Sequence, residues 1–118
     1  MTARKTPPVK KVRGILLTPG GEVSVVEVEN SVRALWEVVG GYVERIPLRD
    51  GADLFANRES QGLRRHKNAL ADELLQRYGK RPTRLVIVDN ALVLGEVTPS
   101  GDSTDVPDWV LASLTRRG

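Results

Sequence analysis

Residues 12–28 read VRGILLTPGGEVSVVEV, in which two aliphatic and β-branched runs flank the break Pro19-Gly20-Gly21. Runs of this composition favour β-strands, and a short break rich in proline and glycine favours a turn. The stretch therefore predicts a β-hairpin with strands over 12–17 and 23–28. The same pattern, two short strands followed by a helix, continues outward along the rest of the chain.

A helix is predicted directly after this hairpin. Asn30 or Ser31 offers its N-cap. One apolar stripe at positions i, i+3, i+4 and i+7 follows, made of Val32, Leu35, Trp36 and Val39. Gly40 and Gly41 end the helix, because glycine readily adopts the left-handed backbone used beyond a C-cap. With Tyr42 they form a turn that we interpret as structural rather than as a ligand site, since glycines that end a helix do not match a dinucleotide-binding fingerprint.

The second unit starts with a predicted strand over 42–48. Pro47 lacks the amide hydrogen that a sheet ladder needs, so we expect it at a sheet edge or a strand end. Asp50-Gly51 is a turn signal, and 52–57 is the expected return strand. Residues 58–67 are interpreted either as a polar loop or as a backward extension of the next helix to Gln61.

The helical signal is strong from Asn68 onward. An apolar stripe follows this residue, made of Leu70, Ala71, Leu74, Leu75 and Tyr78. Gly79 stands where a C-cap glycine is expected. Apolar residues 85–88 and 92–94 then predict two strands on either side of the turn Asp89-Asn90.

A short last helix completes the third unit, because Pro107 suits the first turn of a helix. The predicted order is thus ββα repeated three times, without a repeat in the residues themselves. Strands in consecutive pairs favour hairpins. We therefore expect an α+β domain with a mostly antiparallel sheet and two to three helices on one side.

The composition of the chain excludes several kinds of functional site. The chain has 118 residues, 40% of them hydrophobic, and we expect a flexible basic tail over 1–11 and one domain over 12–118. The absence of cysteine excludes disulfides, thiolate zinc sites and cysteine nucleophiles, and the single histidine, His66, argues against a Ser-His-Asp triad. No apolar run approaches the ~20 residues of a membrane span, so the expected location is the cytoplasm, without membrane contact.

Several segments together resemble the DUF3846 family of small uncharacterised proteins. Residues 38–44 read VVGGYVE and are similar to the family's opening signature, and 68–71 read NALA, similar to its asparagine-led helix start. Phe55 and Asn57, the segment 86–95 and the acidic segment 102–107 follow in the family's order, so the resemblance covers roughly 14–110. It implies a source in bacteria, their phages or mobile elements, and it implies no established activity. The basic stretch 58–67 and Asp89, where the family has glycine, depart from the pattern.

Cations gather before and after the helix that Asn68 opens. Residues 63–84 carry seven cations and two acids. Cations beside the free amide donors of a helix start can bind phosphate or carboxylate, although a solvated basic loop or a longer helix is the interpretation that we favour. The candidate anion-binding or nucleic-acid-binding residues are Arg64, Arg65, Lys67, Asn68, Arg81 and Arg84.

Two further sets of residues lie near the C-terminus. The acids Asp102, Asp105 and Asp108 match no calcium-binding loop, so we interpret Asp105 as a helix cap and expect no metal. Trp109, if exposed beside Val110 and Leu114, would mark a surface for a protein partner.

These observations favour a non-enzymatic binding module of phage or mobile-element type, without catalytic residues or cofactors. It would contact a host protein or a second copy, through apolar surface near the last helix or an open sheet edge at the Pro47 strand, which would allow a homodimer. The alternatives are nucleic-acid binding by 63–84, with steep salt dependence, and capture of a small anionic ligand near Asn68.

Overall fold

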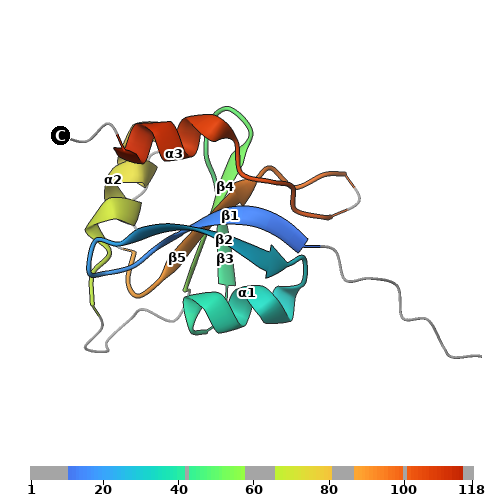
Figure 1. Cartoon of the computed structure of the whole chain (residues 1–118), viewed down its shortest axis with the longest axis horizontal. Coiled ribbons are helices and arrows are strands. Elements are labelled where there is room, and N and C mark those ends of the chain that lie inside the picture. The colour runs from blue at the N-terminus through green and yellow to red at the C-terminus, as the bar shows by residue number, and fades with distance from the viewer. Residues whose placement is uncertain (1–10, 42, 58–65, 81–86, 100, 116–118) are drawn as a thin grey trace, which may run out of the picture.

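The protein has an α+β fold, which confirms the fold class predicted from the sequence. The computed structural model describes residues 11–41, 43–57, 66–80, 87–99 and 101–115. The elements are β1 (Lys11–Leu17), β2 (Val23–Glu29), α1 (Val32–Val39), β3 (Val43–Pro47), β4 (Ala52–Asn57), α2 (Ala69–Tyr78), β5 (Ala91–Gly95) and α3 (Asp108–Thr115) (Figure 1). All strand pairs are antiparallel.

The five strands form one sheet in the order β2-β1-β5-β4-β3. The two predicted hairpins, β1–β2 and β3–β4, are both present, and β5 joins them at the centre of the sheet. Val93 of β5 lies opposite Ile15 of β1 on one side and Leu54 of β4 on the other. The sheet therefore ends at β2 and at β3, and Pro47 is the last residue of an edge strand, as expected.

In the part of the chain that the structure describes, the third unit contributes one strand to the sheet rather than the predicted two, and the order of elements is ββαββαβα. The strand expected over 92–94 is β5. The strand expected over 85–88 lies partly outside the described residues, and Val88 makes only a single bridge, with Lys67. Ile87 donates its N–H to Asp72 Oδ1 at 2.8 Å and accepts at its carbonyl from the N–H of Asn68, also at 2.8 Å. The backbone of this segment thus holds the start of α2 and is not available to a sheet neighbour.

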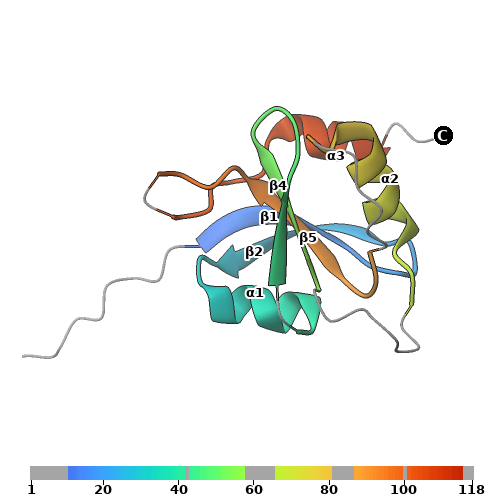
Figure 2. The same cartoon turned by 180° about the vertical axis from the view of Figure 1, so that it is seen from behind.

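The helices cover both faces of the sheet, which corrects the expectation that they gather on one side. Ala91 and Val93 of β5 belong to a core cluster with residues of α2 and α3, whereas Leu92 and Leu94 belong to a second cluster with Leu35 of α1. Figures 1 and 2 show α1 on the opposite side of the sheet from α2 and α3. Because successive side chains of a strand point to opposite faces, a continuously apolar β5 needs cover on both.

The predicted helix boundaries are confirmed where the caps are described. The Ser31 hydroxyl accepts a hydrogen bond from the Ala34 N–H at 3.1 Å, and Gly40 ends α1 with φ of 82°. Asn68 is the N-cap of α2, so this helix does not extend back to Gln61. Gly79 is the C-cap, but its φ of −63° is extended and not left-handed. No helix in the described part of the chain combines the length and apolarity that crossing a membrane requires.

Candidate functional site

The structure describes only two of the six residues proposed to bind an anion or nucleic acid. Lys67 is exposed and Asn68 is fully buried. The other four, Arg64, Arg65, Arg81 and Arg84, lie outside the described residues. Binding by these cations therefore stays a prediction.

Asn68 has a structural role that the sequence analysis missed. Its side-chain Nδ2 donates to the carbonyl of Leu17 at 2.9 Å and to the carbonyl of Asp89 at 2.8 Å. Its Oδ1 accepts from the N–H of Ala71 at 3.1 Å, as an N-cap does. Both amide hydrogens are used inside the protein, so this side chain joins β1, the segment before β5 and α2, and has no donor left for an anion.

The surface expected at the last helix does not form as predicted. Val110 is 0% exposed and Leu114 is 8% exposed, and both belong to the core cluster under α2 and α3. Trp109 is half-buried, its ring centroid lies 4.7 Å from that of Tyr78, and its Nε1 donates to the Asp50 carbonyl at 2.9 Å. The apolar stripe of α3 therefore packs onto the sheet, and Val110 and Leu114 cannot offer an exposed contact surface.

The acidic set near the C-terminus serves the fold. Asp105 Oδ1 accepts a hydrogen bond from the Arg13 N–H of β1 at 2.8 Å, so its expected role as a helix cap is wrong. Asp108 lies in the first turn of α3, where a carboxylate interacts favourably with the helix dipole. Among the residues that the structure describes, no group of three or more histidine, aspartate or glutamate side chains is placed to hold a metal ion.

Two residues of the turn predicted after α1, Gly40 and Gly41, are described. Gly40 adopts the left-handed backbone of a C-cap, and its N–H donates to the Trp36 carbonyl at 2.8 Å. A Cβ atom on Gly41 would lie 2.9 Å from Asn57 Nδ2, so the second glycine lets the buried Asn57 side chain approach the turn. Tyr42 lies outside the described residues.

One edge of the sheet, β3, is covered at the end where Pro47 lies. Pro47 of β3 has no N–H, and its carbonyl accepts from the Lys80 N–H at 3.3 Å. The Arg49 N–H donates to the Tyr78 carbonyl at 2.7 Å, and Leu48 bridges to Gly79. The segment after α2 thus covers this edge only at its Pro47 end. Beyond Val43 and Arg45 the described residues place no neighbouring strand, so β3 is the edge strand that the sequence suggested, and its pairing with a second copy stays a prediction.

The other edge, β2, is open in the part of the chain that the structure describes. The Thr18 N–H donates to the Glu22 carbonyl at 3.1 Å, and β1 and β2 continue from this pair in register. Because hydrogen-bonded pairs alternate along an antiparallel ladder, the backbone groups of Val23, Val25, Glu27 and Glu29 point away from β1. The Glu29 carbonyl already accepts from the Ser31 N–H at 2.9 Å, so the first three residues are the ones that offer both an N–H and a C=O to a neighbouring strand. We call these outward groups the β2 edge. Val25 is 51% exposed, and among the described residues Trp36 is the other large apolar residue that is exposed.

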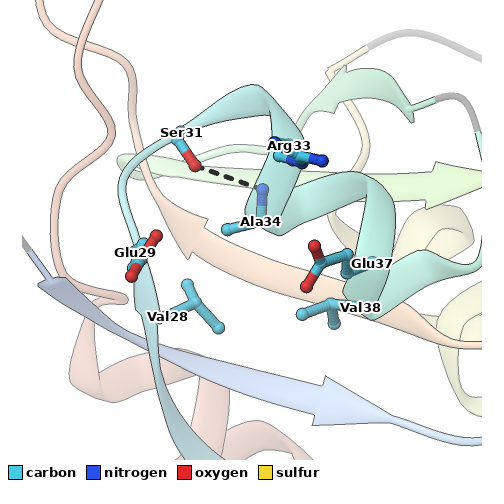
Figure 3. A pocket seen from close by; sticks show the side chains of 7 residues that line it. All are labelled: Val28, Glu29, Ser31, Arg33, Ala34, Glu37 and Val38. Carbon is cyan, nitrogen blue, oxygen red and sulfur yellow. Dashed lines mark hydrogen bonds between the residues drawn. The ribbon is translucent and has the colours of Figure 1, made fainter.

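A hollow lies where the end of β2 meets α1, and we call it the β2–α1 hollow. It has a volume of about 360 Å³ and is lined by Val28, Glu29, Ser31, Arg33, Ala34, Glu37 and Val38. Figure 3 shows Val28 and Val38 pointing toward one another, with Glu29 beside Val28 on β2, Glu37 beside Val38 on α1, and Arg33 farther along α1. The hollow therefore combines apolar side chains with two carboxylates, the surroundings that suit a long cationic side chain.

The sequence analysis predicted β2 and α1 correctly, but it did not predict the β2–α1 hollow between them. The partial signal is the run 23–29, VSVVEVE, in which the buried Val28 stands between two exposed glutamates. The missing information is that β2 lies at the end of the sheet, which depends on β5 taking the other side of β1.

Comparison with known proteins places the chain in a family. The profile of DUF3846, a domain of unknown function, matches residues 12–117, nearly the whole chain. No curated protein and no solved structure matches it. The resemblance seen in the sequence is thereby confirmed, and the chain belongs to the DUF3846 family.

Proposed function

We propose that this DUF3846 protein is a non-enzymatic binding module, and that it takes a lysine or arginine side chain of a partner protein into the β2–α1 hollow. The observation that carries the proposal is the pairing of apolar side chains with Glu29 and Glu37 in one hollow of about 360 Å³. The family's expected phage or mobile-element origin makes a host protein the partner class that we favour.

The chemistry of the hollow matches one kind of side chain. The methylene groups of a lysine or arginine can contact Val28 and Val38, while its charged end lies between the two carboxylates (Figure 3). A charge-assisted hydrogen bond to a carboxylate is stronger than a neutral one. Two carboxylates and one guanidinium, that of Arg33, line the hollow, so its lining carries a net negative charge. An acidic or neutral polar side chain would not offset this charge and should bind more weakly.

The buried polar residues support a binding role over a catalytic one. An active site commonly holds buried polar or titratable groups aimed at a cleft. Here Asp53 accepts from the Val97 N–H at 3.1 Å, Asn68 joins three segments, and the Ser103 N–H donates to Asn30 Oδ1 at 3.2 Å. None of these residues lines the β2–α1 hollow. Their polar groups serve the packing of the described core.

The test is a titration of the protein with short peptides, in which NMR monitors the methyl signals of the hollow. Four short peptides differ only at one central residue, which is Lys, Arg, Gln or Glu. We expect the Lys and Arg peptides to shift the methyl signals of Val28, Ala34 and Val38, with roughly tenfold higher affinity than the Gln peptide, as two exposed ion pairs would give. The Glu peptide should bind most weakly.

Variants locate the effect in the hollow. Glu29→Gln combined with Glu37→Gln should remove the preference for Lys over Gln, while Glu96→Gln, an exposed glutamate outside the hollow, should keep it. Equal affinity for the Lys and Gln peptides, or a preference that survives the double substitution, would overturn the proposal.

A further inference from the structure

We infer that β2 is a dimerisation strand: two copies of this chain pair their β2 strands antiparallel, across a two-fold axis that passes beside Val25. The pairing would join two five-stranded sheets into one sheet of ten strands. This inference concerns the β2 edge and does not depend on what the β2–α1 hollow binds.

The β2 edge offers unused backbone groups. Val23, Val25 and Glu27 each direct one N–H and one C=O away from β1, and within the described residues no strand lies beyond them. Such a row is a template for another strand, and proteins protect it with proline, a bulge, a covering segment or charged side chains. At the opposite edge Pro47 and the segment around Gly79 protect the end of β3. On β2 the described part of the chain provides no proline, bulge or cover, and its charged residues are Glu27 and Glu29.

The outward residues of β2 are complementary to themselves. With the two-fold axis at Val25, Val25 lies opposite Val25 of the second copy, and Val23 lies opposite Glu27. Val23, Val25 and Glu27 then face only one another, so all their N–H and C=O groups can form hydrogen bonds across the axis, and the remaining outward residue, Glu29, faces Gly21. Shifting the axis leaves at least one of the three facing a residue outside this set.

Charge favours the same register. An axis at Glu27 would place two carboxylates directly opposite one another, which is destabilising. With the axis at Val25, the two Glu27 residues are four positions apart along the strands, about 14 Å. The most exposed large apolar side chain, Val25 at 51%, instead meets its own copy and is covered. The separation of the two Glu27 residues and the coverage of Val25 are why we infer that a second copy pairs with the β2 edge.

The chain allows a direct test, because it contains no cysteine. In Val25→Cys the two thiols of a dimer would sit on directly opposed residues, whose Cα atoms are about 5.5 Å apart, within the range of a disulfide. In Glu27→Cys, a matched variant on the same face of the same strand, the thiols would be about 14 Å apart. We expect mild oxidation at high protein concentration to link Val25→Cys into dimers and to leave Glu27→Cys monomeric. Equal linking of both variants, preferential linking of Glu27→Cys, or no linking of either would overturn the inference.

A charge exchange tests the axis without cross-linking. Val25→Glu and Val25→Lys should each be monomeric in sedimentation equilibrium, because each places like charges opposite one another. An equal mixture of the two should dimerise again, since Val25 faces only its own position. Val25 is exposed, so both variants should keep the wild-type circular dichroism spectrum. A wild-type chain that stays monomeric at millimolar concentration, or a mixture that stays monomeric while wild type dimerises, would contradict the inference.

Discussion

The side chain of Asn68, at the start of α2, donates a hydrogen bond to the backbone carbonyl of Leu17, at the end of β1, over 2.9 Å. These residues are 51 positions apart in the sequence and both are fully buried. The bond fixes the helix that covers one face of the sheet to the first hairpin. A residue that looked like part of a binding site is therefore a structural connection.

Replacing Asn68 should strongly destabilise the fold. Asn68→Ala removes three side-chain hydrogen bonds and leaves the carbonyls of Leu17 and Asp89 without this donor in a buried place. We expect the free energy of unfolding to fall by about 3–5 kcal/mol in urea titrations. Lys67→Ala, at the exposed neighbouring position, should change it by less than about 0.5 kcal/mol. A loss below about 1 kcal/mol for Asn68→Ala would show that the connection contributes little.

Gly95 should not tolerate a side chain. A Cβ atom there would collide with the backbone oxygens of Asp105 and Thr104, the latter at 2.9 Å. Because backbone cannot yield as a flexible side chain does, Gly95→Ala should lower the melting temperature by about 10 °C or more. Gly20→Ala is the control, since a Cβ at Gly20 approaches only Thr18 Oγ1, at 3.9 Å. Similar melting temperatures for the two variants would mean that the chain after β5 does not lie against Gly95.

Asp53 should matter more than its ion-pair partner. Asp53 is buried and its two oxygens accept from Arg45 Nη1 at 3.2 Å and from the Val97 N–H at 3.1 Å, whereas the Arg45 side chain is half exposed. Asp53→Ala leaves a backbone N–H without its acceptor and should cost about 2–3 kcal/mol, while Arg45→Ala should cost about 1 kcal/mol or less. Chemical denaturation compares them, and equal costs would contradict this assignment.

The two tryptophans should differ in their access to solvent. Trp36 is 42% exposed, whereas Trp109 is half-buried against Tyr78 and hydrogen-bonded to the Asp50 carbonyl. Acrylamide should quench the fluorescence of Trp109→Phe, which retains Trp36, more strongly than that of Trp36→Phe. The loss of the Nε1 hydrogen bond should also cost Trp109→Phe about 1 kcal/mol of stability. Equal quenching would mean that α3 does not pack as described.

Much of the fold follows from local residue chemistry. The Pro19-Gly20-Gly21 break, the caps at Ser31 and Asn68 and the return strand after Gly51 all act through neighbouring backbone groups, so the sequence alone predicts them. The sheet order could not be predicted in this way. It depends on β5 entering between the two hairpins, a contact between residues far apart in the chain.

The candidate site was harder to predict for the same reason. Val25 is one more apolar strand residue in the sequence, until β2 is known to end the sheet. Whether Trp109 and its neighbours Val110 and Leu114 form a surface depends on α3, which packs Val110 and Leu114 into the core. The strand predicted at Val88 failed because Asp72 and Asn68 take the backbone groups of Ile87. In each case tertiary contacts decide which residues remain available to a partner.

Amide hydrogen exchange along β2 tests the central claim, an open edge beside α1, most directly. In dilute solution the amides of Ser24, Val26 and Val28, which face β1, should be protected, while those of Val23, Val25 and Glu27 should exchange orders of magnitude faster. At high protein concentration the fast set should gain protection as second copies pair with it. Strong protection of all six amides in dilute solution would contradict the account, because another part of the chain would then already cover this edge.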